Sequence, residues 1–181
     1  MSEIANILKD LTKQFGEETI VSFSGEKKSN VEVISSGCMA FDEALGVGGF
    51  ALGRIYEIYG AEGWGKTTIC LQTTANAQKN DGLVAYIDTE HSLNVEYAQN
   101  LGVNFDNILL SQPDSGDVAL ELCETVVRTG KFKLVVVDSV ASLVPQAEIN
   151  ASMGDTVVGL QARLMSQAMR KLAPVVQANN V

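Results

Sequence analysis

The fold of this chain is decided by the stretch Gly60-Ala61-Glu62-Gly63-Trp64-Gly65-Lys66-Thr67-Thr68. It matches the phosphate-loop pattern in full: a glycine, any four residues, and then Gly-Lys-Thr. Glycines lack a Cβ, so the backbone of such a loop can turn tightly and direct its N–H groups at a phosphate. We expect this stretch to bind a nucleotide, with Lys66 reaching the β- and γ-phosphates and Thr67 binding the Mg²⁺ that bridges them.

The residues on either side of the loop favour the order strand, loop, helix. Residues 54–59 alternate like a strand and are rich in β-branched and aromatic side chains. Residues 67–79 are expected to form a helix whose N-terminus is directed at the phosphates. This context favours a true phosphate loop over a chance glycine-rich turn.

The bulk properties describe a globular chain outside the membrane. Its 181 residues suffice for one domain with a substantial core. There is no apolar run long enough to span a bilayer, and residues 1–20 are polar and charged, unlike a secretory leader. The three cysteines are far apart and lack metal-ligand spacing, which favours a reducing, cytoplasmic location.

Charge argues against a broad nucleic-acid surface, because the net charge is −9 and phosphate contacts need Lys and Arg. The distribution softens this argument. The last acidic residue is Asp155, and it is followed by Arg163, Arg170 and Lys171. We therefore expect any DNA-binding surface to be local and near the C-terminal end.

The chain divides into an N-terminal helix with its linker, residues 1–30, and an α/β core, residues 31–181. Residues 3–15 carry apolar side chains at helical spacing, and residues 24–30 form a polar linker. Strands at 83–88, 108–111 and 134–138 alternate with helices at 94–101, 118–129 and 159–173. Such apolar strands predict a mostly parallel sheet with helices on both faces. The last three residues, 179–181, look like the approach to another strand, so we expect the chain to be a fragment.

Further candidate site residues follow two of the strands. Asp138 closes the apolar strand at 134–138, where it either reaches Mg²⁺ through water or caps the next helix. Glu90 follows the strand ending at Asp88, and either carboxylate could activate water or be structural. Tyr97 either stacks on the base or belongs to the core, and Trp64 either packs over the nucleotide or is exposed. No Asn-Lys-x-Asp motif appears, which favours ATP over GTP.

Motifs along most of the chain resemble those of the bacterial RecA recombinases. The resemblance runs from about residue 5 to the last residue. It includes Lys13-Gln14-Phe15-Gly16, Glu57-Ile58-Tyr59-Gly60, Tyr86-Ile87-Asp88 with Glu90-His91, Ser111-Gln112-Pro113-Asp114, Val135-Val136-Val137-Asp138-Ser139-Val140 and Met165-Ser166-Gln167-Ala168-Met169-Arg170-Lys171-Leu172.

The resemblance implies a RecA-type ATPase core preceded by a helical arm. It implies a DNA-dependent ATPase that uses ATP and Mg²⁺ and forms a helical homo-oligomeric filament on single-stranded DNA. Such a protein pairs that strand with homologous duplex DNA and exchanges strands during DNA repair and the SOS response in the cytoplasm. In such filaments the helix at residues 3–15 would pack on a neighbouring core, and no membrane partner is expected.

For the nucleotide site, the resemblance implies that Glu90 is the catalytic glutamate, acting beside Lys66. It also implies that Tyr97 stacks on adenine. Asn94 stands where the family usually has an Asp near the adenine amino group, and it can still accept that hydrogen bond. Trp64 and the pair Phe50-Ala51 depart from the family pattern without removing a catalytic atom.

For DNA, residues 150–159 resemble the family's first DNA-binding loop. The positions that match contacts to DNA are Val158, Gly159, Arg163, Ser166 and Arg170. Without the resemblance, the two arginines would be read as a solvated helix face. The family's glutamine switch, second DNA-binding loop and C-terminal domain would lie beyond Val181. The alternative for this chain is therefore an uncoupled ATP-binding fragment, or a partner that joins filaments and poisons them.

Overall fold

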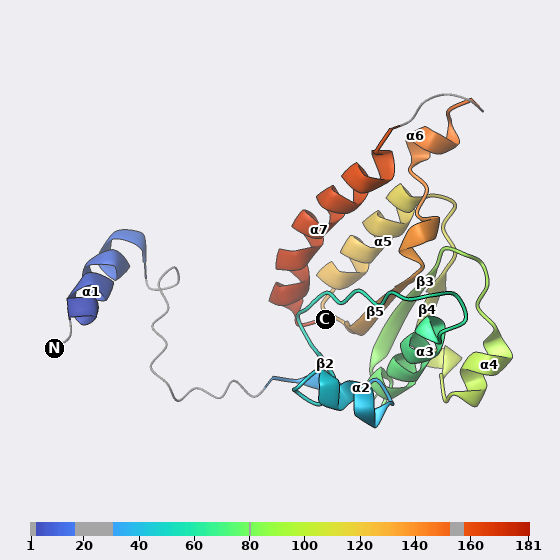
Figure 1. Cartoon of the computed structure of the whole chain (residues 1–181), viewed down its shortest axis with the longest axis horizontal. Coiled ribbons are helices and arrows are strands. Elements are labelled where there is room, and N and C mark those ends of the chain that lie inside the picture. Colours follow the sequence, from blue (N-terminus) through green and yellow to red (C-terminus); the bar gives the residue numbers. More distant parts are fainter. Residues whose placement is uncertain (1–2, 17–30, 80, 153–157) are drawn as a thin grey trace. The chain divides into compact units, whose positions relative to one another are not determined.

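The computed structural model describes residues 3–16, 31–79, 81–152 and 158–181, which are coloured in Figure 1. The chain divides into two units, Met1–Asn30 and Val31–Val181. In the first unit, α1 spans Glu3–Phe15 and confirms the predicted helix. Its apolar positions Ile4, Ile7 and Phe15 are exposed. The predicted linker at residues 24–30 lies outside the described residues.

The second unit is built on a parallel sheet in the order β4-β3-β5. Its strands are β3 (Leu83–Asp88), β4 (Ile108–Ser111) and β5 (Phe132–Asp138). All three confirm the predicted strands, and β5 begins two residues before the predicted start at 134. The register pairs Asp88 with Asp138, so the carboxyl ends of β3 and β5 lie side by side.

Helices cover both faces of this sheet, as predicted (Figure 1). One face packs Ile87, Val135 and Val137 against α5 (Gly116–Arg128) and α7 (Leu160–Asn179). The other face packs Tyr86, Leu134 and Val136 against α3 (Lys66–Ala77) and α4 (Val95–Asn100). Successive strand residues point to opposite faces, so the continuous apolar runs supply both cores at once.

Short elements complete the second unit. They are β1 (Val33–Ile34), α2 (Met39–Ala44), β2 (Phe50–Ala51), η1 (Phe105–Asn107), η2 (Val140–Ser142) and α6 (Gln146–Ile149). β1 and β2 pair in antiparallel fashion. Among the described residues, none of the helices combines the length and the apolar character needed to cross a membrane.

The predicted strand at residues 54–59 is wrong. This segment is in no strand, and Ile55, Tyr56 and Tyr59 are exposed. Alternating side chains give only a tendency toward a strand, which also needs a neighbour to pair with. Within the described residues no strand pairs with this segment. Tyr56 anchors it instead, because its ring packs on Phe50 at 4.9 Å and its hydroxyl accepts a hydrogen bond from the Ala51 N–H.

The helix predicted at residues 159–173 extends further, and α7 continues through Pro174 to Asn179. A proline inside a helix removes one backbone hydrogen bond and crowds the preceding turn. Leu172 and Val176, on either side of it, are buried in the cluster shared with α5, so packing outweighs the local penalty. Asn179, expected to approach a further strand, is the last residue of α7.

Candidate nucleotide-binding site and basic helix face

The phosphate loop leads directly into α3. Gly63 and Gly65 have φ angles of 75° and 84°, in the left-handed region that favours glycine. Gly65 is the N-cap of α3, and no side chain caps the helix there. The first turn of α3 also contains no acidic residue. The positive end of the helix dipole therefore faces the loop, and no acidic residue of the helix's own first turn lies there to neutralise it, which favours binding of an anion.

Lys66 is folded back on this loop. Its Nζ donates to the carbonyl oxygens of Gly60 at 3.0 Å and Ala61 at 2.9 Å. These neutral acceptors are weaker partners for an ammonium group than the charged oxygens of a phosphate. Lys66 is therefore held at the loop by bonds that an incoming polyphosphate can replace.

Two polar side chains meet between α3 and the end of β5. Thr67 Oγ1 donates to Asp138 Oδ2 at 2.9 Å. Of the two readings of Asp138, this contact favours the metal site, because η2 begins after Ser139 and has no side-chain cap. A hydroxyl and a carboxylate oxygen are the ligand types that Mg²⁺ prefers, alone or through water. These residues fit a Mg²⁺ ion in combination with phosphate oxygens.

Asp138 Oδ2 also accepts a hydrogen bond from the Tyr86 hydroxyl at 2.8 Å. Burial and the nearby Asp138 carboxylate raise the pKa of Tyr86 far above its ordinary value. Burial and the same carboxylate also raise the pKa of Cys70, which lies in α3, to about 11. Both groups are therefore neutral at physiological pH.

Asp88 and Glu90 have different surroundings in the structure, which distinguishes the roles they can play. Asp88 is only 2% exposed and accepts hydrogen bonds from Ser92 N, Leu93 N and the Gln112 amide. Burial alone would raise the pKa of Asp88, but these hydrogen bonds outweigh it and the pKa is lowered. Asp88 thus fixes the loop that follows β3.

Glu90, in contrast, is exposed on that loop. Its Oε1 accepts hydrogen bonds from the hydroxyls of Ser139 and Ser142. The loop is tied to the end of β5, because Thr89 N donates to the Asp138 carbonyl at 2.8 Å. Glu90 is therefore accessible to water and held on the same side of the sheet as Asp138.

Tyr97 and Asn94 form a second small network beside the loop. Asn94 Oδ1 accepts from Tyr97 N at 2.9 Å and caps α4. The oxygen predicted to accept from adenine is thus already bonded within the helix start. Tyr97 is 42% exposed, so it is no core tyrosine, and its hydroxyl lies 3.0 Å from Thr68 Oγ1. This places an aromatic ring at the rim of the loop.

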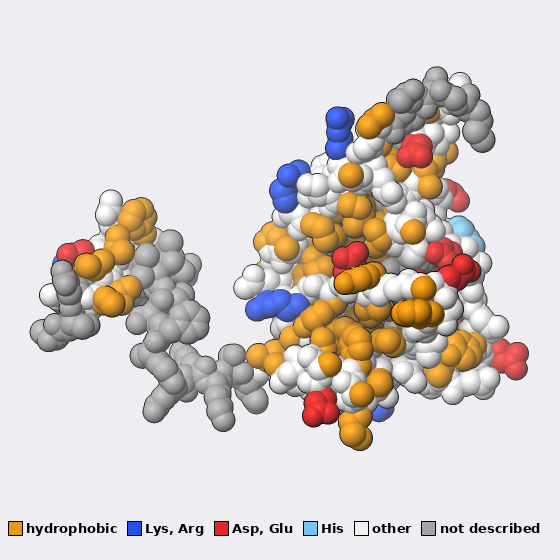
Figure 2. All heavy atoms as spheres, viewed as in Figure 1, with side chains coloured by type: hydrophobic (Ala, Val, Ile, Leu, Met, Phe, Trp, Pro, Cys, Tyr) orange, Lys and Arg blue, Asp and Glu red, His pale blue; other side chains and the backbone are white. Residues whose placement is uncertain are grey.

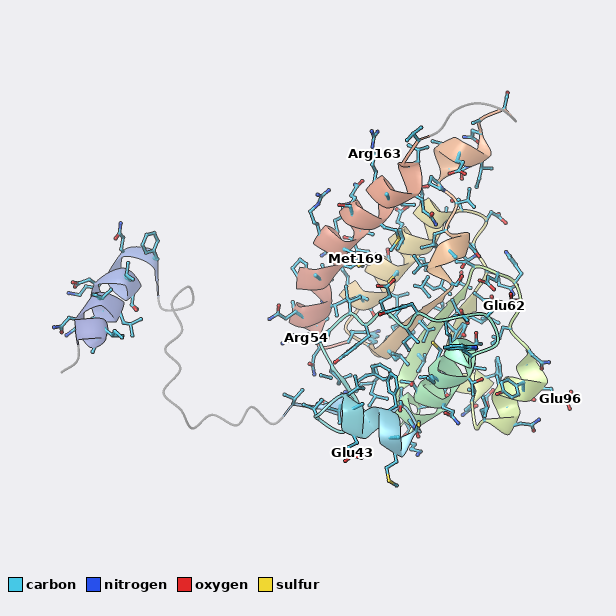
Figure 3. All side chains as sticks on the ribbon, in the orientation of Figure 1. Glu43, Arg54, Glu62, Glu96, Arg163 and Met169 are labelled. Atoms are coloured by element: carbon cyan, nitrogen blue, oxygen red, sulfur yellow. The ribbon has the colours of Figure 1, made fainter. Side chains whose placement is uncertain are left out.

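The remaining loop side chains face solvent. Trp64 is 79% exposed, which favours the second of its two predicted alternatives, an exposed side chain that does not pack within this chain. Ala61 and Glu62 are exposed as well, and Figure 3 marks Glu62 beside the start of α3. The loop therefore presents its outer surface to solvent, where a nucleotide or a second chain can reach it.

The predicted DNA-binding residues lie far from the phosphate loop in the sequence, either just before α7 or on α7 itself. Arg163, Ser166 and Arg170 are exposed and recur at intervals of three and four, so they share one helix face. They line a shallow groove together with Ala162 and Gln167. Figure 2 shows Lys and Arg side chains at the edge of the body where Figure 1 places α7. Figure 3 marks Arg163 on the N-terminal half of this helix.

The approach to α7 is only partly described. Val158 is 77% exposed, and Gly159 forms the N-cap of α7 with a φ angle of 70°. Met153, Gly154 and Asp155, assigned to the same DNA-binding loop, lie outside the described residues. Gln161, in the first turn of α7, donates its amide to the carbonyls of Val140 and Ala141. The basic helix thus contacts η2, whose residue Ser142 bonds to Glu90.

Sequence reasoning missed several residues of this site. The only signals for them in the sequence are a tyrosine inside the apolar strand β3, a glutamine directly after β4, and two serines soon after the aspartate that ends β5. These residues are Tyr86, Gln112, Ser139 and Ser142.

Comparison with known proteins assigns the family. The family model described as the RecA N-terminal domain matches residues 2–181. The chain is 53% identical over 170 residues to the protein named "Protein RecA" of Mycoplasma mobile, covering 94% of this chain and 51% of that protein. It is 49% identical over 180 residues to "Protein RecA" of Clostridium botulinum, covering 99% and 51%.

A third relative gives the same result. "Protein RecA" of Listeria monocytogenes is 54% identical over 169 residues, covering 93% of this chain and 49% of that protein. The chain spans about half the length of the curated relatives it matches. This chain therefore belongs to the RecA family, and its residues 2–181 correspond to the N-terminal domain of that family.

Proposed function

We propose that this chain is the ATP-binding part of a RecA-type recombinase. The full activity would be a DNA-dependent ATPase that polymerises on single-stranded DNA and promotes pairing and strand exchange with homologous duplex DNA, in cytoplasmic DNA repair and the SOS response. The observation that carries the proposal is the hydrogen bond from Thr67 to Asp138 at the end of β5, next to Lys66, which is held on the carbonyls of the phosphate loop. The family relationship supports it.

In the nucleotide site, Lys66 exchanges the carbonyls of Gly60 and Ala61 for the β- and γ-phosphates of ATP. Loop N–H groups and the start of α3 bind the remaining phosphate oxygens. Thr67 would hold Mg²⁺ directly, and Asp138 would hold it through water. When bound, this ion neutralises charge on the phosphates.

Glu90 is the proposed general base. Both serine hydroxyls bond to its Oε1, so Oε2 is the oxygen that can accept a proton from water attacking the γ-phosphate. Tyr97 supplies a ring for adenine at the rim of the loop, and Asn94 positions that ring by capping α4. Asp88 keeps the loop of Glu90 in place.

DNA is the proposed partner of the start of α7. The sequence of α7 contains no carboxylate. A DNA phosphate that approaches the exposed Arg163 and Arg170 is therefore not repelled by a negative charge on the same helix. Ser166 lies between them and adds a hydrogen-bond donor, and Val158 and Gly159 precede the helix. A second copy of the chain is the proposed partner of α1, whose apolar positions are exposed.

The proposal is tested by ATP hydrolysis with and without single-stranded DNA. Wild type is compared with Glu90→Gln and with Glu121→Gln, which removes an exposed carboxylate on α5 as a matched control. We expect DNA-stimulated turnover that falls by about a hundredfold or more in Glu90→Gln and is kept in Glu121→Gln. Binding of ATP without stimulation would support the alternative function, an uncoupled or filament-poisoning fragment. Absence of ATP binding would contradict both.

A further inference from the structure

Tyr86 brings a hydroxyl group from the core into the proposed metal site. It lies on the central strand β3, is 1% exposed, and packs in the cluster that contains Leu71, Ala98 and Val136. Tyr86 pairs with Val136 across the sheet, and Asp138 follows two residues later on the same face of β5. The ring therefore lies along the core, and its hydroxyl reaches the carboxylate at the strand end.

The two hydroxyls on Asp138 Oδ2 come from different surroundings. Thr67, at 2.9 Å, is exposed in the first turn of α3 and belongs to the loop that must rearrange around phosphate. Tyr86, at 2.8 Å, is fixed by packing on every side. A buried phenol hydroxyl needs a partner, and a bond to a carboxylate is among the stronger ones available. The Tyr86 bond therefore persists when the loop moves.

We propose that Tyr86 is a positioning residue for the metal site. Its hydroxyl holds Oδ2 of Asp138, so the carboxylate keeps one orientation beside Thr67 before Mg²⁺ arrives. The inference rests on the proposed function, because it deepens the role of Asp138 there. Partners that orient a metal-binding group in other proteins change metal affinity by about 10- to 100-fold when removed.

The test is Tyr86→Phe, which removes the hydroxyl and keeps the buried ring. Tyr56→Phe is the matched control, since that hydroxyl bonds only to the Ala51 N–H in the contacts observed for it. Trp64 is the only tryptophan and is exposed in the loop, so its fluorescence reports ATP binding. The measurements are ATP affinity in EDTA and the Mg²⁺ and Ca²⁺ concentrations that give half-maximal tightening of ATP binding.

In Tyr86→Phe we expect the Mg²⁺ midpoint to rise about tenfold while ATP affinity in EDTA stays unchanged. The Ca²⁺ midpoint should rise less, because Ca²⁺ accepts irregular geometry and Mg²⁺ does not. Tyr56→Phe should match wild type. In an Asp138→Asn background, Tyr86→Phe should shift the Mg²⁺ midpoint no further.

An unchanged Mg²⁺ midpoint in Tyr86→Phe would overturn the inference. So would a parallel loss of affinity in EDTA and in Mg²⁺, because that pattern marks a general loss of structure. If Tyr86→Phe unfolds, Tyr86→Leu or Tyr86→Met, which add no second tryptophan, decides the matter by the same criteria, applied to the ratio of the ATP affinities in EDTA and in Mg²⁺. Wild type that binds no ATP in either condition would overturn the proposed function and this inference with it.

Discussion

Thr67 Oγ1 donates a hydrogen bond to Asp138 Oδ2 at 2.9 Å, although 71 positions separate the two residues in the chain. Thr67 lies in the first turn of α3, and Asp138 ends β5. The parallel sheet makes this meeting possible, because the carboxyl ends of its strands share one edge with the loop that begins α3. The hydrogen bond joins the phosphate loop to the sheet and defines where a metal ion would lie.

Lys66 is expected to contribute the largest share of phosphate binding. Lys66→Ala removes the ammonium that bonds to Gly60 and Ala61, and with it a charge-assisted contact to phosphate. Such contacts are worth about 2 kcal/mol, so ATP affinity should fall about 30-fold in a Trp64 fluorescence titration. Lys79→Ala, which removes an exposed cation just beyond α3, is the control and should bind ATP like wild type. Equal affinities in wild type and Lys66→Ala would rule out the loop as the phosphate site.

Asp88 is expected to contribute to stability in a pH-dependent way. Asp88→Asn leaves the backbone N–H groups of Ser92 and Leu93 with a weaker acceptor, and should lower the free energy of unfolding by about 2 kcal/mol at neutral pH. Because the pKa of Asp88 is lowered in the fold, its contribution is present above the ordinary Asp pKa and is lost as pH falls through the folded pKa.

Urea unfolding of wild type and Asp88→Asn at several pH values measures this effect. The difference between them should be largest near neutral pH and shrink below about pH 4. Asp106→Asn, which changes an exposed carboxylate on η1, should leave stability within about 0.5 kcal/mol. A difference between wild type and Asp88→Asn that does not change with pH would show that the carboxylate charge is unimportant there.

The arginines of α7 are expected to set the salt dependence of DNA binding. Replacing both Arg163 and Arg170 by Ala should weaken binding of single-stranded DNA and reduce the slope of log affinity against log salt by about 1.4, since each phosphate contact contributes about 0.7. Fluorescence anisotropy of a labelled oligonucleotide measures both quantities. Arg128→Ala is the matched control, because that guanidinium lies on α5 and pairs with Glu124. An unchanged slope in the double variant would place the DNA elsewhere.

Pro174 is expected to be a weak point of α7. Pro174→Ala restores the backbone N–H that a helix interior uses, and should raise the free energy of unfolding by about 2 kcal/mol after the greater entropy of the unfolded chain is included. Thermal unfolding measures the change. A variant less stable than wild type would mean that the proline ring contributes packing that the helix needs.

The sequence predicted the sheet and its covering helices because local apolar runs dictate them. The runs at β3 and β5 are too apolar for any place except between two layers of helices, and observed boundaries differ from prediction by only a few residues. The prediction of a strand at residues 54–59 failed because a strand also needs a pairing partner, which no local pattern reveals. The helix predicted to end at residue 173 continues to Asn179, because the buried neighbours of Pro174 outweigh the local cost of a proline in a helix.

The site was predictable where a motif fixes chemistry and spacing together. The phosphate loop and Asp138 stand out in the sequence for that reason, whereas Glu90 is preferred to Asp88 only through the resemblance to the RecA family. Tyr86 was missed because its hydroxyl acts at the end of a ring that otherwise belongs to the core, and only the sheet register brings it to Asp138. The capping role of Asn94 was missed because the helix start was placed one residue too early.

The most direct measurement is a crystal structure of this chain with Mg²⁺ and a non-hydrolysable ATP analogue. We expect phosphates on residues 60–68, Lys66 Nζ moved from the Gly60 and Ala61 carbonyls to a phosphate oxygen, and Thr67 Oγ1 bound to Mg²⁺ near Asp138. A nucleotide bound elsewhere, with Lys66 still on the two carbonyls, would contradict the assignment of residues 60–68 as the phosphate-binding loop.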